Sequence, residues 1–171
     1  LLDNLLFWLK GQMAGKNLDR SNVVIFQLVK GLEDEHKMLL GRKNIAFNNV
    51  LHPQMFVHAD KEMIRIVLRN LISNAIKFTP ENGSIDIHAE QTATDSLIYV
   101  EDTGIGMSKE TIDRVNAKQY YTTAGTSMEK GSGFGLMLCS DLINRHDGSL
   151  TIESVPGKGS RFIIKLPVTK A

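Results

Sequence analysis

The sequence predicts an α+β fold, a two-layer sandwich in which one mixed β-sheet is covered on one face by helices. Two observations lead to this prediction. The candidate strands alternate apolar and polar residues, as strands with one buried face do. The candidate helices each carry a single apolar stripe, so each helix can bury only one side. With 171 residues, the chain is long enough for one domain with one hydrophobic core.

Composition narrows the class of protein. The chain is 42% hydrophobic and 23% charged, which is ordinary for a soluble domain, and no run approaches the roughly 18 apolar residues of a membrane span. A net charge of +1 without a basic, aromatic-rich run gives no indication of nucleic acid as a partner. The single Cys139 cannot form an internal disulfide and should be a buried thiol. We therefore expect a cytoplasmic domain without membrane contact.

The first half of the chain should contain a short helix, a linker, a long helix, two short strands and a central helix. Apolar residues at helical spacing, polar capping residues and alternating patterns on either side of His52-Pro53 mark these elements. We expect the short helix at 1–15, the linker at 16–21 and the long helix from Ser21 or Asn22 to Gly41. The two short strands should lie at 45–50 and 55–58, and the central helix at Asp60–Thr79. The chain starts at Leu1 with neither methionine nor signal peptide, and we expect it to be part of a longer protein.

The central helix Asp60–Thr79 organises the rest of the prediction. Its first residue can cap the first turn, and Pro80 disfavours helical geometry for the residue before it. Asn70, Asn74 and Lys77 line up along the margin of its apolar stripe. Asparagine is a mediocre helix former, so two of them four residues apart suggest an outside partner. The alternative is that both amides bond neighbouring loops.

The second half should contain two hairpins and two helices separated by a long loop. Alternation, capping and glycine positions place these elements. We expect one hairpin from strands at Ser84–Gln91 and Leu97–Glu101, and a second from strands at Ser149–Ser154 and Arg161–Leu166. The helices should lie at Ser108–Val115 and Leu136–His146, with the loop at Asn116–Lys130 between them. The loop is polar and aperiodic, and loops of its length are usually functional lids or disordered segments. We therefore expect it to be a mobile lid.

Two glycine motifs carry candidate chemistry. Asp102, Gly104 and Gly106 form D-x-G-x-G directly after a predicted strand, where a carboxylate suits a ring with an exocyclic amine, such as adenine. A plain turn capped by aspartate explains this motif equally well. The segment Gly131-Ser-Gly-Phe-Gly135-Leu136 opens a helix, where backbone N–H groups gather around phosphates, and a flexible hinge is the alternative. The segment Gly157–Ser160 has no helix after it and indicates a hairpin turn.

The order of the motifs is more specific than any one of them. An N-x-x-x-N-A-x-K helix comes first, then D-x-G-x-G after a strand, a lid, and G-x-G-x-G-L opening a helix. This order, in NLISNAIKFTP, VEDTGIGM and GTSMEKGSGFGL, resembles the catalytic, ATP-binding domain of sensor histidine kinases, in the superfamily of gyrase, heat-shock chaperone and mismatch-repair ATPases. The resemblance implies a Bergerat-type fold over 22–171. Residues 1–15 themselves resemble the end of the second helix of the dimerisation hairpin in these kinases.

The resemblance implies Mg-ATP as ligand and assigns roles. Asn74 would ligate Mg²⁺, Asn70 would support it, and Lys77 would contact a phosphate. Phe78 would line the adenine pocket, Asp102 would accept from the adenine amine, and Gly104 and Gly106 would let the chain pass close to the nucleotide. The lid residues that would meet the phosphates are Lys130, Gly131, Ser132, Gly133, Phe134, Gly135 and Leu136. Where relatives have a phenylalanine in the lid, this chain has Tyr120 and Tyr121, to which we assign no role.

The resemblance also implies partners. Kinases of this family form homodimers through a hairpin that carries the phosphoacceptor histidine, and a response-regulator receiver domain acts downstream in two-component signalling. The acceptor histidine is normally followed by an acidic residue. The resemblance identifies no such acceptor histidine in this chain. We expect most of its five histidines to be surface or structural residues. Membrane anchoring of the full-length protein stays open.

Three functions are consistent with these motifs: the ATP-binding half of a histidine autokinase, an ATPase switch of the same superfamily, and a nucleotide-binding interaction module without catalysis. Hydrolysing relatives have a glutamate four residues before the Mg²⁺ asparagine to activate water, and Asn70 stands there in this chain. An asparagine cannot take a proton, and a missing base typically costs about 10² to 10⁴ in rate. This favours transfer of the phosphoryl group to a protein acceptor.

Overall fold

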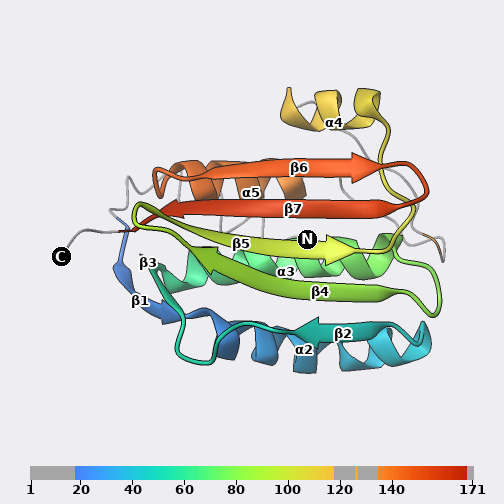
Figure 1. The fold of residues 1–171 in the computed structure, drawn as a ribbon, viewed down its shortest axis with the longest axis horizontal. Helices are drawn as coiled ribbons and strands as arrows, with labels where there is room; N and C mark the ends of the chain where they lie inside the picture. Colours follow the sequence, from blue (N-terminus) through green and yellow to red (C-terminus); the bar gives the residue numbers. More distant parts are fainter. Residues whose placement is uncertain (1–17, 118–125, 127–134, 169–171) are drawn as a thin grey trace.

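A five-stranded mixed sheet is the frame of the molecule in the computed structural model, which describes residues 18–117, 126 and 135–168. The strand order is β2-β4-β5-β7-β6, as Figure 1 shows. These strands span Ala46–Asn49 (β2), Ser84–Gln91 (β4), Asp95–Asp102 (β5), Gly159–Pro167 (β7) and Ser149–Val155 (β6). Strands β2 and β4 run parallel, and the other neighbours run antiparallel, which makes the sheet mixed.

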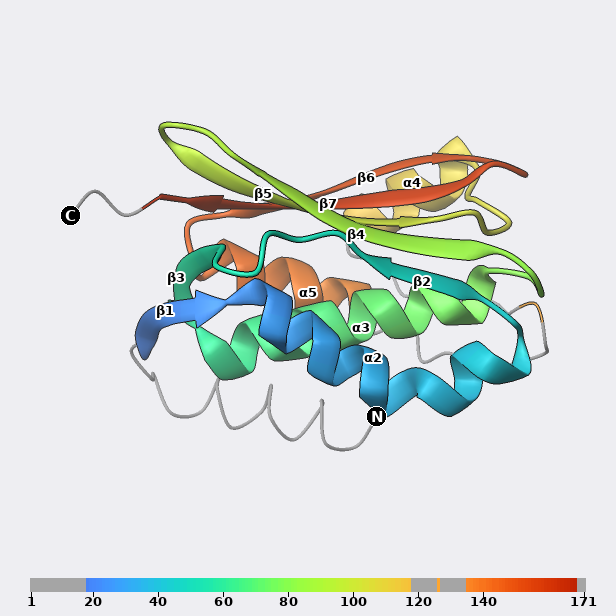
Figure 2. The same ribbon diagram turned by 60° about the horizontal axis from the view of Figure 1, so that its bottom comes forward.

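Helices cover one face of this sheet, which confirms the predicted two-layer sandwich. Figure 2 shows α2, α3 and α5 together on one side of the strands. They span Ile25–Arg42 (α2), Lys61–Phe78 (α3) and Gly135–Asn144 (α5). The short helix α4, Lys109–Asn116, lies instead beside the edge strand β6 (Figure 1). Helix α3 begins after an Asp60 cap that accepts from the Met63 N–H at 3.2 Å, as the sequence predicted.

The structure corrects the prediction at the start of the described chain. Helix α2 begins at Ile25 and not after a cap at Ser21 or Asn22, because Arg20–Val24 forms a strand, β1. Strand β1 pairs antiparallel with β3, Phe56–Asp60, in a separate two-stranded sheet. Backbone hydrogen bonds to a distant segment therefore outweigh the local capping signal. The predicted helix at 1–15 lies outside the described residues.

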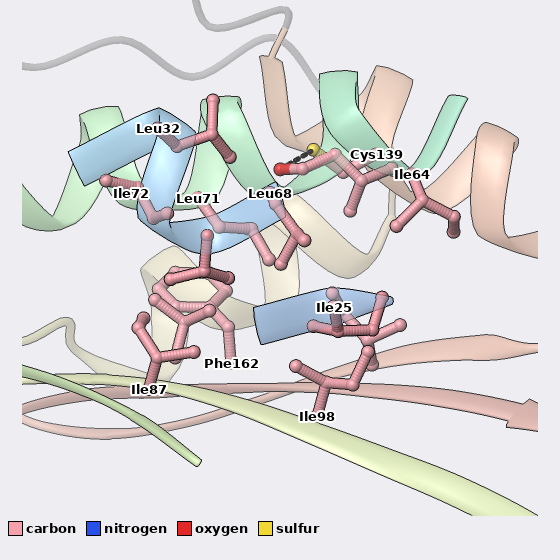
Figure 3. Packing of buried hydrophobic residues seen from close by; sticks show 14 of the residues in the cluster. Ile25, Leu32, Ile64, Leu68, Leu71, Ile72, Ile87, Ile98, Cys139 and Phe162 are labelled. Carbon is pink, nitrogen blue, oxygen red and sulfur yellow. Dashed lines mark hydrogen bonds between the residues drawn. The ribbon is translucent and has the colours of Figure 1, made fainter. Parts of the chain in front are cut away.

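The core lies between the helical layer and the sheet. Helix α3 contributes its apolar stripe, and Figure 3 shows Ile64, Leu68, Leu71 and Ile72 among the packed side chains with Phe162 from β7. Cys139 is also buried here and its thiol donates to the Val67 carbonyl at 3.7 Å, which confirms the prediction of a buried thiol. Burial raises the pKa of this thiol well above its usual range. The half-buried Asn70, Asn74 and Lys77, at the margin of this core, belong to the candidate site.

Candidate functional site

The polar edge of α3 follows from its helical spacing. Asn70, Asn74 and Lys77 are all half-buried, at the border between the apolar stripe and solvent. The Asn70 amide nitrogen donates to the Ile66 carbonyl at 2.8 Å, one turn back along the helix. Its amide oxygen lies beside Gly135, where a Cβ atom would come within 3.0 Å of that oxygen. The first residue of α5 is therefore in contact with the polar edge of α3.

The last turn of α3 contacts the loop that follows β5. The Ile105 N–H donates to the Phe78 carbonyl at 3.1 Å. Gly104 lies so close that a Cβ atom on it would be 2.6 Å from the same carbonyl oxygen. The Lys77 ammonium lies 4.6 Å from the centroid of the Phe78 ring, a cation–π distance. The end of the N-x-x-x-N-A-x-K helix and the D-x-G-x-G loop are therefore in direct contact.

Asp102 is the one buried carboxylate among the described residues, with 8% of its surface exposed. Its side chain accepts from the Gly104 N–H at 2.8 Å and from the backbone of Ser160. Burial raises the pKa of Asp102 to about 6, because desolvation outweighs these two hydrogen bonds. At pH 7 the group is thus mainly an ionised acceptor that is poorly solvated and would gain from a hydrogen-bond donor.

The structure explains two glycines of this loop by contacts within the protein. A Cβ atom on Gly104 would lie 2.6 Å from an Asp102 carboxylate oxygen, so a side chain there would displace it. Gly106 has a φ of 69°, which favours glycine, and a Cβ atom on it would clash with the Val155 carbonyl oxygen. These two positions shape the loop around Asp102 whether or not a ligand is present.

The hairpin between β6 and β7 is one part of the site that sequence reasoning missed. Gly157 donates to the Ile105 carbonyl at 2.7 Å, and Ser160 holds the Asp102 carboxylate. Ser160 lies directly opposite Asp102 in the β5–β7 register. The sequence predicted a plain turn at Gly157–Ser160, and only knowledge that β5 pairs with β7 would have revealed this neighbour. A second missed group, Lys43 with Thr126, lies at the end of α3.

Part of the predicted site lies outside the described residues. This holds for Lys130, Gly131, Ser132, Gly133 and Phe134, and for the two tyrosines at 120 and 121. Most of the predicted lid Asn116–Lys130 also lies outside the described residues. Gly135 and Leu136 are described, and Leu136 is half-buried against the core. The structure thus brings Asn70 together with Gly135, and it brings Phe78 and Asp102 each into contact with Gly104.

The histidines have structural surroundings. His146 is buried, with Nδ1 bonded to the Leu142 carbonyl at 2.7 Å and Nε2 accepting from the Asp60 N–H at 3.0 Å. Burial lowers the pKa of His146. His88 stacks on Tyr99 at a centroid distance of 4.5 Å. The other three also have hydrogen-bonding partners close by, namely Leu32 for His36, Gln54 for His52 and Asn22 for His58.

Two features are missing from the part of the chain that the structure describes. Its residues contain no group of three or more His, Cys, Asp or Glu side chains placed to hold a metal ion. Within the same part of the chain, no helix combines the length and the apolar character needed to cross a membrane.

Comparison with known proteins identifies relatives. Over 170 residues, 98% of this chain, it is 33% identical to the adaptive-response sensory kinase SasA of Crocosphaera subtropica, and it spans 44% of that protein. The nucleotide-free catalytic domain of histidine kinase ThkA superposes with a TM-score of 0.77 at 27% identity, over 89% of this chain and 99% of that one. ThkA solved in complex with the response regulator protein TrrA matches 98% of this chain and 48% of that one, at 25% identity and a TM-score of 0.75.

The family comparison covers the site itself. Residues 59–170 match the family described as "Histidine kinase-, DNA gyrase B-, and HSP90-like ATPase", and this range contains α3, the D-x-G-x-G loop and the β6–β7 hairpin. The match extends over more than half of the chain, and the similar proteins just described are histidine kinases. The chain therefore belongs to this ATPase family, as a domain of the histidine kinase type.

Proposed function

We propose that this domain binds Mg-ATP and donates the γ-phosphate to a histidine on a dimerisation hairpin, as the catalytic part of a two-component histidine kinase. The main support is the position of α3 between Gly135, at the start of α5, and the D-x-G-x-G loop. Asn70 meets Gly135 at one point of the helix, and Phe78 meets Gly104 at its end. A ligand along this edge would meet amide and ammonium groups beside Asp102.

The adenine half of the site would be the D-x-G-x-G loop. Asp102 is held by Gly104 and Ser160 and is ionised at neutral pH, so it can accept from an exocyclic amine. Guanine has a carbonyl oxygen where adenine has this amine. A guanine ring would therefore place one hydrogen-bond acceptor against another, the Asp102 carboxylate. Phe78 would supply an apolar surface for the ring, and Gly104 and Gly106 would keep the loop's backbone close to the base.

The phosphate half would be the polar edge of α3. Asn74 would ligate Mg²⁺ with its amide oxygen, Asn70 would support it, and Lys77 would contact a phosphate. The lid amides from Lys130 to Phe134, with Gly135 and Leu136, would complete the phosphate contacts. Mg²⁺ readily takes phosphate oxygens and waters, so a single asparagine oxygen from the protein is chemically sufficient. Mg²⁺, when bound, would neutralise phosphate charge.

Transfer to an imidazole, and not to water, fits the side chains present. A nitrogen of the acceptor histidine attacks the γ-phosphorus, ADP leaves with the electron pair of the broken P–O bond, and the other ring nitrogen releases its proton. The domain has to position the nucleotide and stabilise its charge, which are the main requirements of phosphoryl transfer. Asn70 has no basic atom with which to activate water, and its amide is bonded to Ile66.

The proposed partners are a second copy of the full protein, joined through the dimerisation hairpin, and a response-regulator receiver domain. The complex of ThkA with TrrA supports the second partner, because that histidine kinase was captured with a response regulator. A cytoplasmic location is proposed for the domain on the basis of its single buried thiol.

Labelling with γ-³²P-ATP tests the function. The present chain should release phosphate slowly and take up no label, whereas a longer polypeptide that includes the preceding hairpin should acquire acid-labile label. Asn74→Ala in the longer polypeptide should abolish the label and serves as the matched control. Brisk phosphate release by the present chain would favour an ATPase switch. A longer polypeptide that binds ATP without labelling would favour a non-catalytic module.

A further inference from the structure

Lys43 is a buried ammonium at the end of α3. It follows the last residue of α2, and only 7% of its surface is exposed. Its Nζ donates to the carbonyls of Ile76 at 2.8 Å, Lys77 at 3.1 Å and Thr79 at 3.3 Å. Carbonyls at a helix C-terminus are the negative end of the helix dipole, which a cation stabilises. The last turn of α3, which carries Lys77 and Phe78, is therefore fixed by a residue that is distant in sequence.

The same ammonium also contacts Thr126, the one described residue between Ala117 and Gly135. The Lys43 Nζ lies 2.8 Å from the Thr126 hydroxyl, so its three N–H bonds are shared among four oxygen acceptors. That hydroxyl lies 3.2 Å from the carbonyl oxygens of both Lys77 and Thr79, and it can donate to one of them. The Thr126 N–H donates to the Lys77 carbonyl at 3.0 Å. Thr126 and Lys43 thus bind the same carbonyls and each other.

The position of this contact relates it to the phosphate half of the site. Thr126 meets α3 at Lys77, and Gly135 meets it at Asn70, seven residues earlier. Seven residues of α-helix span about 10 Å, and Asn74 lies between the two contacts. The described residues on either side of 127–134 are therefore attached to α3 at both ends of its polar edge.

We propose that Lys43 and Thr126 are positioning residues for the nucleotide's phosphates. Lys43 holds the last turn of α3, which carries Lys77, and Thr126 binds both that turn and the Lys43 ammonium. Neither residue needs to touch the nucleotide. This inference rests on the proposed function, because it assumes that the polar edge of α3 binds a polyphosphate. It differs from a simple helix cap in predicting an effect that depends on the phosphates of the ligand.

Thr126→Val gives the sharpest test, because Thr126 is exposed and the substitution removes the hydroxyl while nearly preserving shape. The Kd for Mg-ATP should rise about tenfold, which is the usual size of losing a hydrogen bond to a charged group, and the Kd for adenosine should stay unchanged. Thr126→Ser keeps the hydroxyl and should bind both ligands like the wild type. An unchanged Kd for Mg-ATP in Thr126→Val, or an equal loss for adenosine, would overturn the inference.

Lys43→Met extends the test to the ammonium, with Lys30→Met as the control at an exposed lysine of α2. Lys43→Met should also weaken Mg-ATP at least tenfold, and adding Thr126→Val to it should cause little further loss because the two groups act together. Strictly additive losses would contradict the coupling. Failure of the wild-type domain to bind Mg-ATP would refute the proposed function, whereas wild-type binding with unaffected variants refutes only the positioning roles.

Discussion

Replacing Asp102 by asparagine should stabilise the fold while weakening the site. The pKa of this carboxyl is about 6 in the folded protein, against 3.8 for the group in solvent. At about 1.4 kcal/mol for each pKa unit, burial of the ionised form costs about 3 kcal/mol of folding free energy above pH 6. Asparagine has nearly the same shape and carries no charge, so Asp102→Asn should recover part of this cost.

The direction of the pKa shift determines how the difference in stability between the two proteins should vary with pH. Because the folded pKa is raised, the folded wild type binds more protons than the unfolded chain between about pH 3.8 and 6. The contribution of Asp102 to stability is therefore complete below pH 3.8 and lost as the pH rises through 6. The advantage of Asp102→Asn should accordingly be largest at pH 7 to 8 and should shrink as the pH falls below 6.

Urea denaturation of both proteins from pH 4.5 to 8 measures this difference. Other titrating groups contribute equally to the two proteins, so subtracting the two unfolding free energies isolates residue 102. Calorimetry at pH 7.5 should show weaker ATP binding by the variant and less discrimination against GTP. A variant that is less stable than the wild type at pH 8, or a stability difference that does not change with pH, would refute the reasoning.

Three further predictions follow from other residues. Asn74→Ala should reduce ATP affinity by about 1.5 to 3 kcal/mol in Mg²⁺ and much less in EDTA, as calorimetry with and without the ion would reveal. His146 has a lowered pKa, so the wild type should lose stability as the pH falls below 6.5, and His146→Gln should flatten that part of the urea-derived profile. Leu71→Ala should cost about 2 to 5 kcal/mol in urea denaturation, because Leu71 is fully buried in the core.

The sequence predicted most elements because their signals are local. Helix α3 has a capping aspartate at one end and Pro80 after the other, and β4 occurs at Ser84–Gln91 as expected from its alternation. Strand β1 was missed because Arg20–Val24 is short and half polar, and what makes it a strand is pairing with β3 more than thirty residues away. Its serine and asparagine imitate a helix cap.

The candidate site likewise contains residues that local patterns predict and residues that they do not. Asn70, Asn74 and Lys77 could be placed along one edge of α3 from helical spacing alone. The support of Asp102 by Ser160 could not, since it depends on the register between β5 and β7. Lys43 was equally hidden, because nothing near it in sequence indicates that its ammonium reaches the far end of another helix. Contacts between distant segments carry no local pattern.

The place of β7 in the sheet has a consequence for how the protein is made. It is the last strand among the described residues, yet it lies between β5 and β6 in the interior of the sheet. A nascent chain that ends before Gly159 has no partner for the free edge of β5 and no Ser160 beside Asp102. During translation, the ability to recognise a nucleotide base would therefore arise only after this strand has left the ribosome and inserted.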